Sequence, residues 1–367
     1  MDHELLSEVK QTARKFAARH IEPVAADVDH HDPAFPREVF QQGLEAGFDR
    51  FVLPEQAGGY GFSMVELCGL VSSLAAICPG HAMVFGIHAA AIKAIYDAGS
   101  DSSLLSSVFE SSLPIGVAIP DPVEADDFDA ALFATQTDND RILLSGEPGL
   151  AANGSPAGFY LVFGKDQDKK PCAILIRGES NGFTIEPPEL TLGLRAMPLV
   201  NSSFERADLA ESSILAVGTD ALGFYRSLIG NLSIVASAAA VGLMESASKK
   251  AIAYTAERYQ GGKTIIDHSH LRNILGSMSA QTTSARGVMF FAATRTGDLQ
   301  SCLSTKATVT DLAVKVCTDA VQVLGGYGYM RDYGLEKAMR DAAVLALLPI
   351  SNIRAELLIA AKEKSNL

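Results

Sequence analysis

Two adjacent glycines separate two helical segments in the sequence VQVLGGYGYMRDYGLEKAMRDA, residues 321–342. Apolar residues at helical spacing precede Gly325 and Gly326, and a charged helical segment follows them. Because glycine has no side chain, a ligand could come close to the backbone at this break. The alternative is that the two glycines only end the first helix.

Histidines and acids elsewhere could also do chemistry. His88 lies on a small-residue face of a predicted helix, where it could act as an unusual base, and the alternative is a hydrogen-bonded structural histidine. The acidic segment VEADDFDAA, residues 123–131, could meet a cationic substrate group, and the alternative is a solvated loop. No cysteine pair has metal-ligand spacing, so no metal site is predicted.

Composition and charge exclude several classes of protein. The net charge of −13 argues against binding to nucleic acid or to anionic membranes, which need basic surfaces. The longest nearly apolar run, SIVASAAAVGLM, is well short of the ~20 residues of a membrane span. Five scattered cysteines and an acidic N-terminus, unlike a signal peptide, predict a cytoplasmic protein without membrane insertion.

The hydrophobic pattern predicts a multidomain α+β protein, as a chain of 367 residues is too long for one ordinary core. Residues 1–114 have helical spacing and form a predicted N-terminal helical domain. Residues 115–213 contain short alternating segments, which predict a central antiparallel β-sandwich or barrel. Residues 214–367 predict a C-terminal four-helix bundle, with helices near 220–258, 267–297, 305–324 and 335–363.

Four ordered motifs resemble those of the acyl-CoA dehydrogenase family. They are LPEQAGGYG at 53–61, GLRAMPLVNSSFERADL at 193–209, ERYQGGKTI at 257–265 and the stretch around the paired glycines. The likeness runs through essentially the whole chain. It implies the three-part fold above and assembly as a homotetramer or dimer, because the family builds its FAD site partly from a second subunit.

The resemblance also implies cofactor positions. Gln322, Gly325, Gly326 and Gly328 would approach the FAD of a neighbouring subunit, and Arg258 would face its pyrophosphate, which suits a guanidinium.

Family chemistry is α,β-dehydrogenation of an acyl-CoA thioester in fatty acid metabolism. A carboxylate removes the α-proton, the β-hydrogen leaves as hydride to the flavin, and electrons pass to an electron-transfer flavoprotein or a similar acceptor.

This sequence departs from the family where the chemistry would occur. Pro349 stands at the position of the catalytic glutamate, and Leu232 at the position where other members carry the base. Proline has neither a carboxylate nor a backbone N–H, so a base and one donor to the thioester oxygen are both missing. At the flavin positions, Leu150 replaces a tryptophan, Ala152 a threonine and Pro120 another threonine, and the chain has no tryptophan at all.

The sequence is compatible with three functions. The chain could be an FAD-dependent acyl-CoA dehydrogenase with a displaced base. It could instead be a catalytically silent subunit of a hetero-oligomer with an active paralogue. The third is a flavin or acyl-CoA binding protein that carries out no dehydrogenation.

Overall fold

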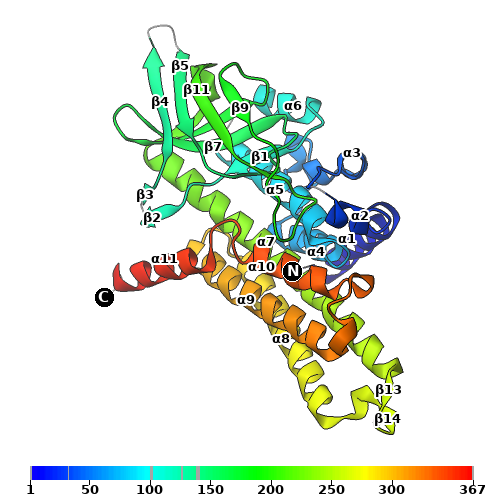
Figure 1. Ribbon diagram of the computed structural model, residues 1–367. Coiled ribbons are helices and arrows are strands. Elements are labelled where there is room, and N and C mark those ends of the chain that lie inside the picture. The colour runs from blue at the N-terminus through cyan, green and yellow to red at the C-terminus, as the bar shows by residue number, and fades with distance from the viewer. Residues whose placement is uncertain (1, 32, 100–101, 125–126, 138–140, 366–367) are drawn as a thin grey trace.

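The computed structural model describes residues 2–31, 33–99, 102–124, 127–137 and 141–365. It confirms the three-part architecture: an N-terminal helical part, a central sheet and a C-terminal helical part (Figure 1). Helices give way to strands between Glu110 and Ile115, and the strands of the central sheet end at Val217, just before the longest helix.

The N-terminal part is built around two helices buried along most of their length, α4 and α5. Ser63 and Glu66 fix the start of α4 as a capping box, in which the Val65 amide donates to Ser63 Oγ at 3.1 Å and the Ser63 amide to Glu66 Oε2 at 2.9 Å. The α-helices of this part are α1 (His3–Phe16), α2 (Ala25–His30), α3 (Arg37–Glu45), α4 (Met64–Ala75), α5 (Pro79–Asp97) and α6 (Ser102–Glu110).

The central part is a ten-stranded sheet with the main order β10-β6-β1-β7-β4-β5-β11-β9. Most pairings are antiparallel as predicted, but β7 pairs in parallel with both β1 and β4. This strand is buried on both faces over Phe159–Gly164, as expected of a parallel strand inside a sheet. The strands are β1 (Ile115–Ala118), β4 (Ala131–Thr137), β5 (Arg141–Glu147), β6 (Ala151–Ala152), β7 (Phe159–Asp166), β8 (Pro171–Arg177), β9 (Phe183–Ile185), β10 (Leu199–Val200), β11 (Ser202–Ala210) and β12 (Ile214–Val217), and a separate pair is β2 (Pro122–Glu124) with β3 (Asp127–Phe128).

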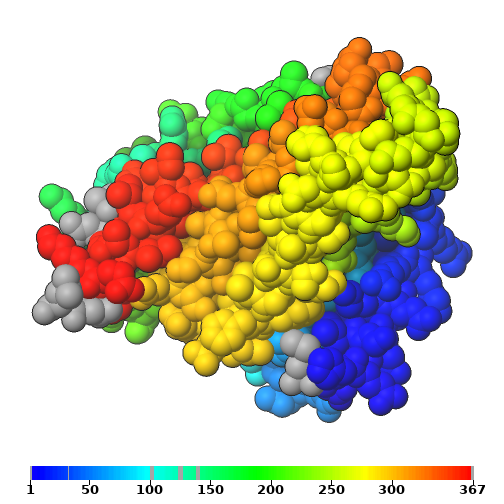
Figure 2. Space-filling model, turned by 90° about the horizontal axis from the view of Figure 1, so that it is seen from below, coloured from blue at the N-terminus to red at the C-terminus, as the bar shows by residue number. Residues whose placement is uncertain are grey.

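The C-terminal part begins with α7 (Thr219–Glu257), which runs through the centre of the molecule. Among the described helices, only α7 is long and apolar enough to cross a membrane, yet 94% of its apolar window is buried inside the fold. Figure 2 shows the yellow to red helices of this part across one face. They are α8 (Ser269–Ala293), α9 (Leu299–Leu324), α10 (Leu335–Leu345) and α11 (Asn352–Ser365), and the short strands β13 (Tyr259–Gln260) and β14 (Lys263–Thr264) join α7 to α8.

Two predicted helices were wrong in extent. Residues 335–363 form two helices, α10 and α11, and not one. The break contains Pro349, which cannot donate a helical hydrogen bond and disfavours helical geometry at the residue before it. In addition, α9 begins at Leu299, six positions before the predicted start at 305, with its first turn capped by Asp298.

The contact between α4 and α7 depends on a glycine. A Cβ atom at Gly242 would lie 2.0 Å from the Ser72 carbonyl oxygen, so the two backbones are too close for any side chain. Gly223 lies on the same helix but is exposed, and a Cβ there would meet no atom within 4 Å.

We expect Gly242→Ala to destabilise the protein by about 3 kcal/mol or more, because α4 and α7 must separate. Gly223→Ala should stabilise it by up to ~1 kcal/mol, since alanine favours a helix. Differential scanning calorimetry of the two variants measures both shifts. Equal melting temperatures for the two variants would contradict the close-packing interpretation.

Candidate active site

A cavity of about 700 Å³ lies where the three parts of the chain meet. Helix α5 contributes Met83 and Ile87, α7 contributes Leu232, and the C-terminal part contributes Ala343, Val344, Leu347, Leu348 and Pro349. The remaining lining residues come from the sheet and its loops and from the segment before β10. Most of the lining is apolar, which suits an aliphatic ligand.

The structure brings together the predicted flavin and base positions. Pro120, Leu150, Ala152, Leu232 and Pro349 all line this one cavity, although they are spread over 230 residues of sequence. None of these side chains can accept a proton or donate a hydrogen bond. Leu232 and Pro349, the two positions predicted for a base, therefore line the cavity without a carboxylate.

The polar side chains in the described lining are three carboxylates and one hydroxyl. The carboxylates are Asp121, Asp129 and Glu147, and the hydroxyl of Thr191 already donates to the Gly193 carbonyl oxygen at 2.7 Å. Part of the predicted acidic segment, residues 125–126, lies outside the described residues, but Asp129 belongs to it. Glu147 was not among the site residues predicted from the sequence. Its place at the end of a strand, β5, is the only feature of the sequence that could have indicated a role at the cavity.

The other predicted cofactor residues lie apart from the cavity lining. Arg258 follows α7, and Gln322, Gly325, Gly326 and Gly328 surround the end of α9. The Arg258 guanidinium lies 5.9 Å from the centre of the Tyr327 ring, so the two loops are neighbours. We call Arg258, Gln322 and residues 325–328 the Arg258–glycine surface.

The three glycines of this surface differ in whether the fold of the chain itself requires a glycine. Gly325 has a φ of 60°, which ends α9, and a Cβ at Gly328 would lie 2.0 Å from the Val321 carbonyl oxygen. Gly326 needs neither a positive φ nor space within the chain, since a Cβ there would meet no atom within 4 Å. The backbone at Gly326 is therefore open to another molecule, with the exposed cation of Arg258 close to the same turn.

His88 is buried beside β1 and is not among the residues that line the cavity. Its Nδ1 accepts a hydrogen bond from the Ile115 amide at 3.2 Å, and its ring packs edge-on against Phe40. Burial lowers the pKa of His88 to about 3, so the ring stays neutral near neutral pH. These contacts give His88 a role in joining α5 to β1.

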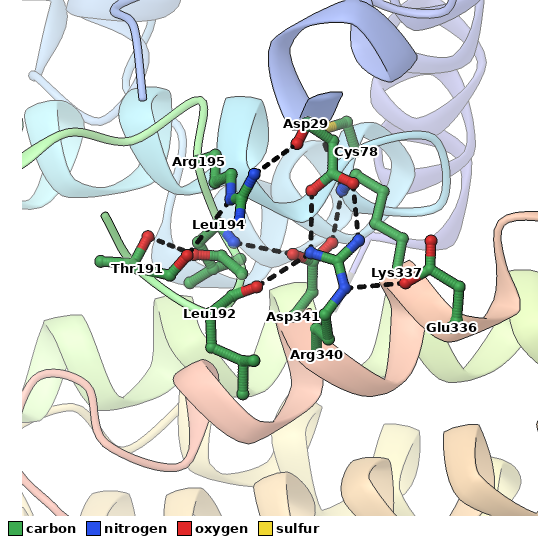
Figure 3. A network of polar contacts seen from close by, with 11 residues as sticks. Asp29, Cys78, Thr191, Leu192, Leu194, Arg195, Glu336, Lys337, Arg340 and Asp341 are labelled. Carbon is green, nitrogen blue, oxygen red and sulfur yellow. Dashed lines mark hydrogen bonds and ion pairs between the residues drawn. The ribbon is translucent and has the colours of Figure 1, made fainter. Parts of the chain in front are cut away.

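A buried ionic network fixes one side of the cavity (Figure 3). Arg340 on α10 donates to both carboxylate oxygens of Asp29, at 3.1 and 2.6 Å, and to the Leu192 carbonyl oxygen at 2.8 Å. Burial alone would raise the pKa of Asp29, but Arg340 and Lys337 bring it below its usual range. Leu192 lines the cavity, so this network positions that wall.

A second carboxylate on α10 extends the network. Asp341 accepts a hydrogen bond from the Leu194 amide at 2.7 Å and pairs with Lys337 at 2.5 Å. The Lys337 ammonium also lies 3.8 Å from the Cys78 sulfur (Figure 3). One helix therefore holds Asp29, the segment before β10 and the start of α5 together.

Lys306 fixes the part of the cavity wall that the loop after α10 forms. Its side chain is fully buried, and its ammonium donates to the carbonyl oxygens of Ala346 and Ile350, at 2.8 and 2.6 Å, and to Asn352 Oδ1 at 2.5 Å. These three acceptors lie on both sides of Pro349. The loop that carries Pro349 is therefore held in place by the buried side chain of Lys306 on α9, and burial lowers the pKa of this ammonium to about 7.

We expect Lys306→Met to destabilise the protein by about 3 kcal/mol, because three acceptors lose their donor at once. Lys315→Met is the matched control on the same helix, since Lys315 forms only an exposed pair with Asp319 and should cost less than about 0.5 kcal/mol. Thermal unfolding compares the two. A Lys306 variant as stable as the control would show that the loop does not depend on the hydrogen bonds of the Lys306 ammonium.

Cys78 is expected to titrate apart from the other thiols. Burial alone would raise its pKa, but Lys337 and His81 favour the thiolate and lower the pKa to about 7. Burial raises the pKa of the other four thiols, to about 12 for Cys172 and Cys302.

As the pH is raised through about 7, the ultraviolet absorbance should therefore increase by the amount expected for one thiolate, that of Cys78. Lys337→Met should move this step above the ordinary thiol pKa of ~8.5, and Cys78→Ser should remove it. If the Cys78→Ser protein still shows the increase in absorbance near pH 7, the increase belongs to another group and the assignment to Cys78 is wrong.

Comparison with known proteins agrees with this geometry. The N-terminal domain of acyl-CoA dehydrogenases matches residues 3–103, and the C-terminal domain of acyl-CoA dehydrogenases matches residues 227–348. The chain is 27% identical over 360 residues to a probable acyl-CoA dehydrogenase of Mycobacterium leprae, covering 94% of this chain and 92% of the relative. It is 29% identical over 367 residues to an NADH-dependent acryloyl-CoA reductase of Anaerotignum propionicum, covering 94% and 91%.

Solved structures show the same fold. Butyryl-CoA dehydrogenase from Megasphaera elsdenii superposes with a TM-score of 0.91 at 22% identity, over 99% of this chain and 98% of that chain. Together with the matched N- and C-terminal domains, this establishes that the chain belongs to the acyl-CoA dehydrogenase family.

Proposed function

We propose that the chain acts in FAD-dependent α,β-dehydrogenation of an acyl-CoA thioester as a catalytically silent subunit. It would complete the flavin site of an active paralogue in a hetero-oligomer. The observation that carries this proposal is the division of the site residues. The cavity has lost its base positions to Leu232 and Pro349, while the Arg258–glycine surface lies outside that cavity and is open to another molecule.

The residues of the cavity do not fit the flavin ring system. An isoalloxazine needs hydrogen-bond donors along its polar edge, and Leu150 and Ala152 offer none from their side chains. The three lining carboxylates would also repel the diphosphate of the cofactor.

The Arg258–glycine surface does fit the other end of the cofactor. Arg258 supplies a guanidinium, whose planar donors match a diphosphate, and Gly326 leaves the backbone accessible. In a paired subunit these groups would hold the diphosphate of a flavin whose ring lies in the partner's cavity. The flavin would supply the redox chemistry there, and an electron-transfer flavoprotein in the cytoplasm would accept the electrons.

A second candidate is a dehydrogenase that works alone, as a homotetramer. The observation in its favour is that Asp121, Asp129 and Glu147 line the cavity, so a carboxylate from the sheet could replace the missing base. Under this alternative the purified chain binds FAD by itself and oxidises an acyl-CoA. Under the silent-subunit proposal it does neither.

Co-expression with a family member that carries the catalytic glutamate tests the proposal. We expect a stable mixed complex with visible flavin absorbance, whereas the chain alone should stay colourless after addition of FAD. Arg258→Ala should lower the flavin content of the mixed complex at least about tenfold, because a charge-assisted contact to a phosphate is lost.

Arg295→Ala is the control, because Arg295 is an exposed cation that stacks on Phe291 outside both sites. It should leave the flavin content unchanged. A yellow, active homo-oligomer of the chain alone would favour the second candidate. A colourless chain that forms no mixed complex would exclude both, and would leave acyl-CoA binding without dehydrogenation.

A further inference from the structure

The start of α5 holds a thiol in a positively charged environment. Cys78 is the N-cap residue of this 19-residue helix, and its side chain accepts no hydrogen bond from the first backbone amides. Its sulfur therefore lies at the positive end of the helix dipole, which favours an anion. The Lys337 ammonium lies 3.8 Å from the same sulfur, across the contact between α5 and α10 (Figure 3). Two separate sources of positive charge therefore act on one sulfur atom.

His81 is a titratable group beside this thiol. It lies one turn further along α5 and is fully buried, and neither of its ring nitrogens has a hydrogen-bond partner in the described part of the chain. A buried polar group without a partner is costly, so the ring favours any group that supplies one. An oxygen atom bound to the Cys78 sulfur would be such a group, since His81 is close enough to favour the Cys78 thiolate.

The surroundings of Cys78 suit a small reagent only. Cys78 has 2% of its surface exposed, whereas the Lys337 side chain that contacts it has 17% exposed and connects the thiol with solvent. The segment before β10 covers the start of α5, because a Cβ at Gly80 would lie 3.0 Å from Ala196 Cβ. An oxidant about as small as water fits such an opening better than a bulky one.

The other thiols of the chain lack this environment. All four are buried, and burial raises the pKa of each of them. At Cys78 burial acts in the same direction, but Lys337 and His81 outweigh it and lower the pKa to about 7. Because the thiolate is the form that reacts with oxidants, the surroundings select Cys78 among the five cysteines.

We infer that Cys78 is a redox-sensing thiol, which hydrogen peroxide oxidises to a sulfenic acid. The thiolate sulfur attacks one oxygen of the peroxide, so that an S–O bond forms and the O–O bond breaks. The sulfur gives two electrons to the peroxide. The hydroxide that leaves takes up one proton from the solvent and departs as water.

This modification acts on the contact between α5 and α10. The added oxygen needs space where Lys337 and the segment before β10 already lie close, and added atoms in a packed interior are destabilising. Both helices also line the cavity, so oxidation of Cys78 affects two of its walls. The inference is independent of the proposed function, because oxidation is detected on the cysteine itself and needs no flavin and no partner.

Peptide mass spectrometry after brief exposure to hydrogen peroxide tests the inference. The purified full chain is treated near neutral pH, the peroxide is removed with catalase, and the chain is unfolded in urea that contains dimedone, which labels sulfenic acids. We expect at least about tenfold more label on Cys78 than on any other cysteine, because only this thiol is largely ionised. Cumene hydroperoxide, a bulky oxidant, should label Cys78 at least about tenfold more slowly, because the thiol is buried.

The pH dependence of the unmodified chain needs no variant. The groups that act on the thiol are His81 on α5 and Lys337 and Asp341 on α10. The initial rate of labelling should rise about tenfold from about pH 6 to about pH 8 and then level off, because the thiolate fraction of a group with a pKa of about 7 changes in this way.

Lys337→Met removes the cation and should slow labelling about tenfold at neutral pH, because a thiol with the ordinary pKa of ~8.5 is ionised to only about 3% there. Lys315→Met, which removes an exposed cation of α9, should leave the rate unchanged. If the Lys337 variant does not fold, the pH dependence of the unmodified chain decides.

Thermal unfolding tests the effect on the fold. The peroxide-treated chain should melt about 2 °C or more below the untreated chain, because α5 and α10 must accommodate the added oxygen. Cys78→Ser treated in the same way should show no such shift. The inference is overturned if another cysteine is labelled first, if the rate is still rising tenfold per pH unit above about pH 8, or if oxidation leaves the melting temperature unchanged.

Discussion

The burial of one helix, α7, is the constraint on which the rest of the structure depends. This 39-residue helix contacts α4 and α5 of the N-terminal part, strands β8 and β12 of the sheet, and α8, α9 and α10 of the C-terminal part. A helix surrounded on all sides must be apolar along its whole circumference, and it must be narrow where a neighbour comes close. The run of alanine, serine and glycine in its middle satisfies both requirements, and the direct contact of Gly242 with the Ser72 backbone shows how little space remains.

Around this helix, polar contacts hold the walls of the cavity in place. Lys306 anchors the loop after α10, and Arg340 and Asp341 fix the segment before β10. These supports are buried polar groups, and removing one partner leaves the other unsatisfied, so they cannot be lost singly without a large cost in stability. The side chains that line the cavity are under no such constraint, and those of Pro349, Leu232 and Ala152 have no group that can form a hydrogen bond.

Local patterns predicted much of the fold, because helical spacing, strand alternation and glycine breaks act between near neighbours. The end of α9 at Gly325 and the start of the sheet after residue 114 are examples. The apolar pattern continues across Pro349 and so predicts one helix, whereas the proline separates α10 from α11. The pair of Asp29 with Arg340 spans 311 residues, and Glu147 reaches the cavity only through the β4–β5 ladder. Such contacts arise from tertiary packing, for which a single sequence carries no local signal.

The absence of tryptophan has a spectroscopic consequence at the rim of the cavity. Leu150 lies there with about half of its surface exposed, so a larger aromatic side chain at that position meets both solvent and cavity. An indole placed at residue 150 would be the sole tryptophan emitter in the chain. Its fluorescence would shift toward shorter wavelength whenever the cavity became filled and dry, so cavity occupancy could be followed in real time with no label and no enzymatic turnover.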